Sequence, residues 1–177
     1  MEDFYIKFKI ISEQNDIKQL NLLYDSVDNI EKQLLMNYSA MFYNLNFIKY
    51  LVEEKDMNIY ADNDYVFNIS CSHNKPNITR YVISLTNGYD YINDALVQYA
   101  HNGNIDFVED MIRMGGDITY KNNEAINWAA GFGRLEMVKY LLKNGANIDL
   151  DKSIRLAKQN KHIEMITFLE TYLQEGL

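Results

Sequence analysis

Residues 127–148 read NWAAGFGRLEMVKYLLKNGANI, and this stretch decides the fold because the chain repeats it. Residues 97–118, which lie 30 residues upstream, carry the same order of small, polar and apolar positions. The matching pairs are Ala100 with Ala130, Gly103 with Gly133, Val108 with Val138 and Gly115 with Gly145. Self-similarity at a fixed offset is typical of proteins built from stacked structural repeats. The sequence therefore predicts a solenoid of small helical units.

Within one unit the sequence predicts two short helices joined by a tight turn. The first spans residues 125–130, where Ala129 and Ala130 allow a neighbouring backbone to pack closely. The second, residues 135–142, carries an apolar stripe at the helical period. Glycine accepts the left-handed conformation that closes a helix. We therefore expect positive φ angles at Gly115 and Gly145, which follow the second helices of two successive units.

A resemblance to a known family rests on residues 128–130 (WAA), 133–142 (GRLEMVKYLL) and 144–148 (NGANI). They resemble the ankyrin repeat, in the form found in the large ankyrin families of giant DNA viruses. The resemblance implies an all-α ankyrin-repeat solenoid of about five stacked helix-turn-helix units, with short connecting loops and an N-terminal cap. The spacing of 30 residues is shorter than the usual period of about 33. The family's usual Thr-Pro-Leu-His start is replaced by EAIN at residues 124–127.

Extending the repeat along the chain divides residues 34–177 into successive helix pairs. The predicted repeats span residues 35–62, 65–91, 95–122 and 125–149, and a C-terminal capping pair spans residues 153–173. The second repeat is degenerate, with Pro76 at the start of its second helix, where the missing N–H costs nothing.

Residues 1–33 are expected to form an N-terminal cap or extension, because a solenoid needs an atypical unit to cover its exposed end. Apolar residues alternate from Phe4 to Ile10, and this period of two predicts a short strand at the start of the segment. Apolar residues then recur at helical spacing from Ile17 onward. The alternative interpretation is that the segment holds a small separate functional motif.

The composition argues against several classes of protein. A chain of 177 residues with 47% hydrophobic residues is long enough for one ordinary domain. The net charge of −8 argues against binding to nucleic acid or to an anionic membrane, and suits a protein partner with a basic surface. One cysteine, no apolar run of membrane-spanning length and no signal-peptide pattern at the start predict an intracellular, cytoplasmic protein, in the host cytoplasm if viral. We expect a monomer.

The sequence offers little that could carry chemistry. The three histidines are His73, His101 and His162, and they are too dispersed to form a metal-ligand pattern. Cys71 stands where other repeats carry a small core residue, so we expect a buried, inert thiol. Residues 62–64 begin like a calcium loop, but the sixth and twelfth positions lack the required glycine and glutamate. We expect no enzyme activity, no metal and no cofactor.

The remaining candidate is a binding surface. The resemblance implies that a partner lies in the groove formed by the connecting fingers and the ends of the first helices. The candidate partner-binding residues are Met41, Phe42, Tyr60, His73, Tyr89, Tyr91, His101, Tyr120 and Phe132. Aromatic residues most often dominate binding energy at interfaces, so the preferred anchors are Phe42, Tyr60, Tyr120 and Phe132. The alternative is that Phe42 and Phe132 belong to the core. Trp128 is expected to be buried between adjacent repeats.

These observations favour a non-catalytic protein–protein interaction module that holds a partner in the concave groove of the solenoid. The alternative is an adaptor or host-factor-sequestering viral protein that acts partly through its N-terminal segment. Some viral ankyrin proteins carry a C-terminal F-box. We expect none here, because the sequence ends at Leu177, directly after the last predicted helix pair.

Overall fold

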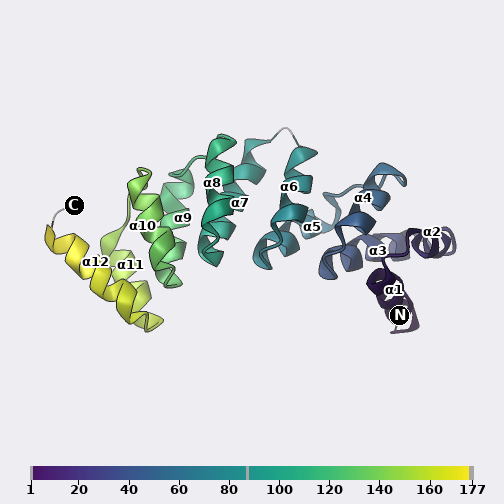
Figure 1. The fold of residues 1–177 in the computed structure, drawn as a ribbon, viewed down its shortest axis with the longest axis horizontal. Helices are drawn as coiled ribbons and strands as arrows, with labels where there is room; N and C mark the ends of the chain where they lie inside the picture. Colours follow the sequence, from purple (N-terminus) through teal and green to yellow (C-terminus); the bar gives the residue numbers. More distant parts are fainter. Residues whose placement is uncertain (1, 87, 176–177) are drawn as a thin grey trace. The chain divides into compact units, whose positions relative to one another are not determined.

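The computed structural model describes residues 2–86 and 88–175, and every regular element among them is an α-helix (Figure 1). The chain forms two compact units, Met1–Leu85 and Thr86–Leu177. The first unit contains α1 (Glu2–Gln14), α2 (Ile17–Asp25), α3 (Asn29–Met41), α4 (Leu45–Glu53), α5 (Ala61–Ser72) and α6 (Pro76–Ser84). The second contains α7 (Tyr89–Asn102), α8 (Ile105–Arg113), α9 (Tyr120–Gly131), α10 (Leu135–Lys143), α11 (Leu150–Gln159) and α12 (Ile163–Glu175).

Each unit is a stack of three helix pairs. In the first unit α1, α3 and α5 are the first helices of their pairs, and α3 packs against both of the others. In the second unit α9 packs against α7 and α11 in the same way. Every first helix also packs against the second helix that follows it, so α9 for example contacts α10. The prediction of an all-α fold built from stacked helix pairs is confirmed.

The turn between the two helices of a pair contains one residue in the left-handed region. These residues are Asn15, Tyr43, Asn74, Gly103, Gly133 and Lys161, with φ between 51° and 82°. The next residue often caps the second helix, because an oxygen of its side chain accepts a hydrogen bond from a free backbone N–H in the first turn. Asn44 accepts from the N–H of Phe47, and Asn104 accepts in the same way from Phe107.

The second helices share a pattern of buried residues. The buried residues are Phe47, Ile48 and Leu51 in α4, Phe107, Val108 and Met111 in α8, and Met137, Val138 and Leu141 in α10. Positions i, i+1 and i+4 lie on one face of a helix, so each of these three helices presents a narrow apolar stripe to its own first helix. The first helix α9 contributes the small buried residues Ala129 and Ala130 to the same core.

The ends of the second helices confirm the predicted glycine turns. Gly115 has φ +93° and Gly145 has φ +91°, which are angles that a residue with a Cβ adopts only at a cost. The corresponding turn after α4 is built on Asp56, with φ +54°. Pro76 occupies the first turn of α6, also as predicted.

The prediction of a strand near the N-terminus is wrong, because Phe4 to Ile10 lie in α1. In a strand all the alternating apolar side chains would share one face. In the helix, Phe8 is fully buried while Ile6 and Ile10 are about half exposed. Phe4 and Phe8 are four residues apart and both contact Tyr38 of α3. The tertiary contacts of these two phenylalanines select the helix over the local period of two.

Successive turns within a unit are tied together by side chains. The amide of Asn44 donates to the carbonyl and the hydroxyl oxygen of Ser12, each at 3.3 Å. The guanidinium Nε of Arg134 donates to the carbonyl of His101 at 3.0 Å. Ser12 and His101 lie in the last turn of the preceding first helix. The turns therefore stack in register, with the cap residue of one pair bonded to the preceding pair.

Two first helices begin with a left-handed turn. Residues 62–64 at the start of α5 and residues 121–123 at the start of α9 all have φ between 49° and 61°. In α9 the side-chain amide of Asn127 donates to the carbonyl of Asn122 at 3.2 Å. In α5 the amide of Asn68 donates in the same way to the carbonyl of Asn63 at 2.9 Å, so both turns are stabilised by an asparagine five residues further along. Asparagine and aspartate accept this conformation more readily than other non-glycine residues. Right-handed helix in α9 consequently begins at Glu124.

Candidate interaction surface

The predicted residues around the first turn of Met1–Leu85 divide between core and surface. Phe42 is half-buried, with its ring centroid 5.7 Å from that of Tyr5 and 5.9 Å from that of Phe8. Met41 is 42% exposed. Phe42 therefore belongs mainly to the packing between α1 and α3, which is the alternative that the sequence left open.

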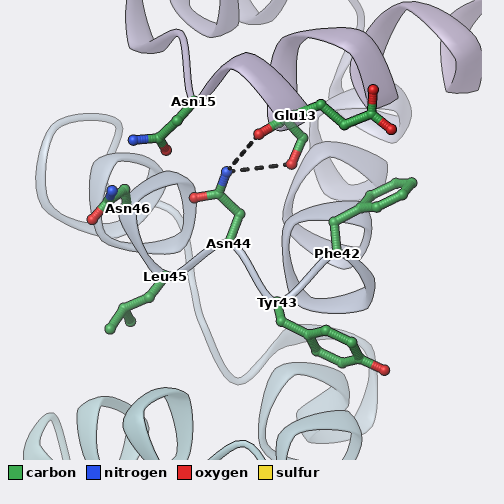
Figure 2. Close-up of a pocket in the computed structure, with 8 residues that line it drawn as sticks. Glu13, Asn15, Phe42, Tyr43, Asn44, Leu45 and Asn46 are labelled. Carbon is green, nitrogen blue, oxygen red and sulfur yellow. Dashed lines mark hydrogen bonds between the residues drawn. The ribbon is translucent and has the colours of Figure 1, made fainter.

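A shallow pocket of about 360 Å³ lies beside this turn (Figure 2). It is lined by Ser12, Glu13, Asn15, Phe42, Tyr43, Asn44, Leu45 and Asn46. Figure 2 shows Asn44 in the middle, with dashed lines marking the two hydrogen bonds that its amide donates to Ser12. The central polar group of the pocket is thus already engaged in joining two turns. Glu13, Asn15 and Asn46 are exposed.

His73 lies at the next turn, beside Tyr43, which the sequence did not single out. Its ring lies 5.8 Å from that of Tyr43, and the ammonium group of Lys75 lies 4.0 Å from the centre of the Tyr43 ring. Tyr43 and His73 are both exposed. A sequence signal was available, since Tyr43 is the only aromatic residue at the left-handed position of any of the six turns.

The tyrosines predicted for the connecting fingers lie at the N-terminal ends of first helices. Tyr60 is half-buried, and its hydroxyl donates to the carbonyl of Val82 at 3.4 Å. Tyr91 is also half-buried. Tyr120 is half-buried at the start of α9, with the ammonium group of Lys121 4.8 Å from its ring centre. The side chain of Tyr89 lies outside the described residues.

An aromatic cluster forms on the unit Thr86–Leu177 from three side chains of two successive helix pairs. The rings of His101 and Phe132 meet edge to face with centroids 4.0 Å apart. Trp128 completes the cluster, with its ring 5.7 Å from that of Phe132 and 6.3 Å from that of His101. The structure thereby brings together two of the predicted site residues, His101 and Phe132. Both Trp128 and Phe132 remain at the surface, 44% and 39% exposed.

The prediction that Trp128 is buried is wrong. The buried positions of α9 include Ala125, Ala129 and Ala130, and Trp128 lies beside this face rather than on it. Its indole N–H donates to a carboxylate oxygen of Glu124 at 3.0 Å. The equivalent residue of the preceding repeat is Gln98, which is polar and exposed. That residue was the signal in the sequence that could have placed Trp128 at the surface.

Burial shapes the electrostatics of His101. Partial burial lowers the pKa of His101 from its ordinary value, and the positive charge of Arg134 lowers it further. A hydrogen bond with the side chain of Asn102 acts in the opposite direction, but is the weakest of the three causes. The lowered pKa favours the neutral imidazole, which suits close packing against the ring of Phe132.

Two kinds of site are missing from the described part of the chain. Residues 2–86 and 88–175 contain no group of three or more histidine, cysteine or acidic side chains that could hold a metal ion. No helix among them is both long and apolar enough to cross a membrane. The thiol of Cys71 is buried, as predicted.

Comparison with known proteins decides the family. A family model for ankyrin repeats (three copies) matches residues 67–152 and, in an overlapping match, residues 96–172. The chain belongs to the ankyrin-repeat family. Ankyrin repeats are generally non-catalytic modules for protein interaction, so the aromatic cluster of this ankyrin chain lies on a fold that commonly binds proteins.

Similar proteins come from a giant virus, as the resemblance implied. Ankyrin repeat protein L675 of Acanthamoeba polyphaga mimivirus is 29% identical over 101 residues, which cover 57% of this chain and 21% of the relative. Ankyrin repeat protein R868 of the same virus is 39% identical over 57 residues, which cover 30% of this chain and 28% of the relative. The chain therefore spans less than a third of the length of either relative.

Proposed function

We propose that this ankyrin-repeat chain is a non-catalytic interaction module that holds a protein partner against the aromatic cluster of His101, Trp128 and Phe132. The observation that carries the proposal is the exposure of two large aromatic rings that contact each other and a third ring. Rings that are packed against one another lose little conformational freedom on binding, and aromatic residues often dominate interface energies. Met41 and His73 are the exposed candidates on the first unit.

The proposal extends to the character of the partner and its place in the cell. A net charge of −8 favours a partner with a basic surface and disfavours nucleic acid. We propose a monomer that acts inside the cell, in the cytoplasm of the host if the chain is viral. Within this proposal no cofactor takes part and no reaction is catalysed.

Capture of the partner from cells that naturally contain the protein tests this function. Wild-type chain and the variants Trp128→Ala and Phe132→Ala are immobilised, and bound proteins are quantified by mass spectrometry. We expect one protein to be lost with both variants, by at least about fivefold, since interface hot spots contribute more than about 1 kcal/mol each. The matched control is Leu173→Ala, which removes a 52% exposed apolar side chain elsewhere on the same unit. Equal capture by all four proteins would refute the proposed surface.

A second role is favoured by one observation at the N-terminus. We propose that α1 and α2 cap the stack of the first unit, since Phe8 and Leu20 are fully buried there. Ile6 and Ile10 nevertheless remain about half exposed one helical turn apart on α1. If the chain acts as an adaptor or sequesters a host factor through residues 1–33, Ile6→Ser with Ile10→Ser should abolish capture of a second protein. Unchanged capture by this double variant would leave only the capping role.

A further inference from the structure

Glu124 and Trp128 of α9 form a single stripe with Phe132, the residue that caps the helix, because residues four apart lie on the same face of a helix. The stripe places a carboxylate, an indole and a phenyl ring in order along the exposed edge of the helix. The hydrogen bond from the indole N–H to Glu124, at 3.0 Å, fixes the carboxylate at the edge of the indole ring. The contact with Phe132 limits the ring from the other side.

The charge of Glu124 is not offset by the basic side chains nearest to it in the sequence. Asp94 occupies the equivalent position one repeat earlier, and it forms an ion pair at 3.0 Å with Lys121. Lys121 is therefore engaged by the neighbouring repeat. Arg134, on the other flank, directs its Nε to the carbonyl of His101. The indole N–H that donates to Glu124 is neutral.

An exposed indole beside an ionised carboxylate is a suitable receptor for a cation. A cation over the face of tryptophan is attracted by the negative charge of the ring face, and tryptophan is the best of the aromatic residues in this respect. The guanidinium group of arginine is planar, so it can stack on an indole while donating hydrogen bonds to a carboxylate at the ring edge. A lysine ammonium group is a compact and strongly hydrated charge that cannot do both equally well.

We propose that Trp128 and Glu124 receive an arginine side chain of the protein partner, with the guanidinium stacked on the indole and hydrogen-bonded to Glu124. This inference rests on the proposed function and specifies the chemistry of the residue that the surface recognises. Phe132 and His101 form the apolar wall beside the bound arginine. The net charge of −8 adds a general attraction for a partner that presents basic residues.

Selection of peptides tests the proposal before the partner is identified. The full chain is immobilised and panned against random dodecapeptides displayed on phage, in parallel with Trp128→Ala. The peptides that bind only the wild-type chain are then synthesised with each arginine replaced by alanine or lysine. Their dissociation constants are measured from the fluorescence of Trp128, which is the only tryptophan in the chain.

We expect the selected peptides to share an arginine whose replacement by alanine weakens binding about tenfold, with lysine intermediate. Glu124→Gln keeps an oxygen that accepts the indole N–H but removes the charge, and should weaken binding of the arginine peptides about fivefold. Glu136→Gln is the matched control, because it removes the same charge from an exposed residue of α10 that pairs with Lys139.

The outcomes separate the inference from the proposed function. Peptides that depend on Trp128 but contain no required arginine, or are acidic, would overturn the inference and leave the interaction surface intact. Equal effects of Glu124→Gln and Glu136→Gln would likewise overturn it. A selection that yields no peptide able to distinguish the wild-type chain from Trp128→Ala would overturn both.

Discussion

Phe42 and Phe132 occupy the same position of two repeats, directly before the left-handed residue of the turn, yet they have different roles. Phe42 packs against Tyr5 and Phe8 of α1 and is half-buried. Phe132 packs against the half-buried His101 and the exposed Trp128, and remains 39% exposed. The position in the repeat fixes the backbone, whereas the preceding first helix decides whether an aromatic side chain is packed into the core or remains at the surface.

The backbone of the turns shows a second difference between the same regions. In Met1–Leu85 the left-handed positions between paired helices hold Asn15, Tyr43 and Asn74, whereas two of the three in Thr86–Leu177 are glycines. Left-handed angles cost a residue with a Cβ about 1–2 kcal/mol, and asparagine less than most. The second unit therefore stores less backbone strain in its turns, and its glycines make it the more recognisable part of the sequence.

The largest effect on stability is expected from truncating Phe8, the buried ring against which Phe42 packs. Phe8 is fully buried and contacts Tyr38, Phe42 and Phe47. Phe8→Ala should lower the free energy of unfolding by about 3–5 kcal/mol, because it leaves a cavity in the core of the first unit. Urea denaturation followed by circular dichroism measures this loss. Ile10→Ala, at a half-exposed position of the same helix, is the control and should cost far less.

A smaller effect separates two glycines of the second unit. Gly145 has φ +91° with open space where a Cβ would stand, so Gly145→Ala should cost only the left-handed strain of about 1–2 kcal/mol. At Gly133, with φ +70°, a Cβ would lie 2.6 Å from Nδ1 of His162, so a steric clash adds to the strain. Gly133→Ala should therefore lower the urea midpoint clearly more than Gly145→Ala. Equal losses would show that His162 moves aside freely.

Alanine at the two equivalent phenylalanines compares core with surface directly. Phe42→Ala should destabilise the chain by about 1–3 kcal/mol, since packing against α1 is lost. Phe132→Ala should cost less than about 1 kcal/mol, because a substantial part of that ring is already in water. Both losses are measured by urea denaturation. A greater loss of stability for Phe132→Ala would reverse the assignment of core and surface.

The sequence predicted the fold well where local chemistry is decisive. Gly115, Gly145 and Pro76 all have the predicted conformations, because a left-handed angle or a missing N–H restricts a position whatever its neighbours are. The helix pairs were predicted from the 30-residue period, because residues at equivalent positions of successive repeats take the same local structure. The strand predicted from Phe4 to Ile10 fails because the alternating pattern also contains the i, i+4 pair of Phe4 and Phe8, and only contact with Tyr38 selects the helix.

The candidate surface was less predictable, because exposure depends on neighbouring repeats. The sequence identifies His101 and Phe132. It misplaces Trp128 in the core, because a large apolar residue in a first helix is expected to stand in for a buried leucine. Tyr43 and Lys75 are not identified, since their contact joins two turns that lie 32 residues apart. Nor does the sequence predict the left-handed turn of residues 121–123, because Lys121 has no preference for that conformation.

The smallest expected effect is a pH dependence at the aromatic cluster. The folded chain lowers the pKa of His101 below its ordinary value of 6.5, chiefly through burial. The unfolded chain then binds more protons near that pH, so the stability from His101 is present above pH 6.5 and is lost as the pH falls toward the folded pKa. His101→Gln should make the decline in the free energy of unfolding between about pH 7 and pH 5 shallower. The change in slope should correspond to at most one proton taken up on unfolding. An unchanged or steeper decline would contradict this.

The central claim is that the aromatic cluster lies at the surface and is available to a partner. Trp128 is the only tryptophan in the chain, so the tryptophan fluorescence of the protein comes from this cluster alone. Acrylamide quenching of its fluorescence in the folded chain is the most direct test. The 44% exposure of Trp128 predicts red-shifted emission that acrylamide quenches readily, with the chain shown to be folded by circular dichroism. Blue-shifted emission protected from acrylamide would place Trp128 in the core and contradict the account.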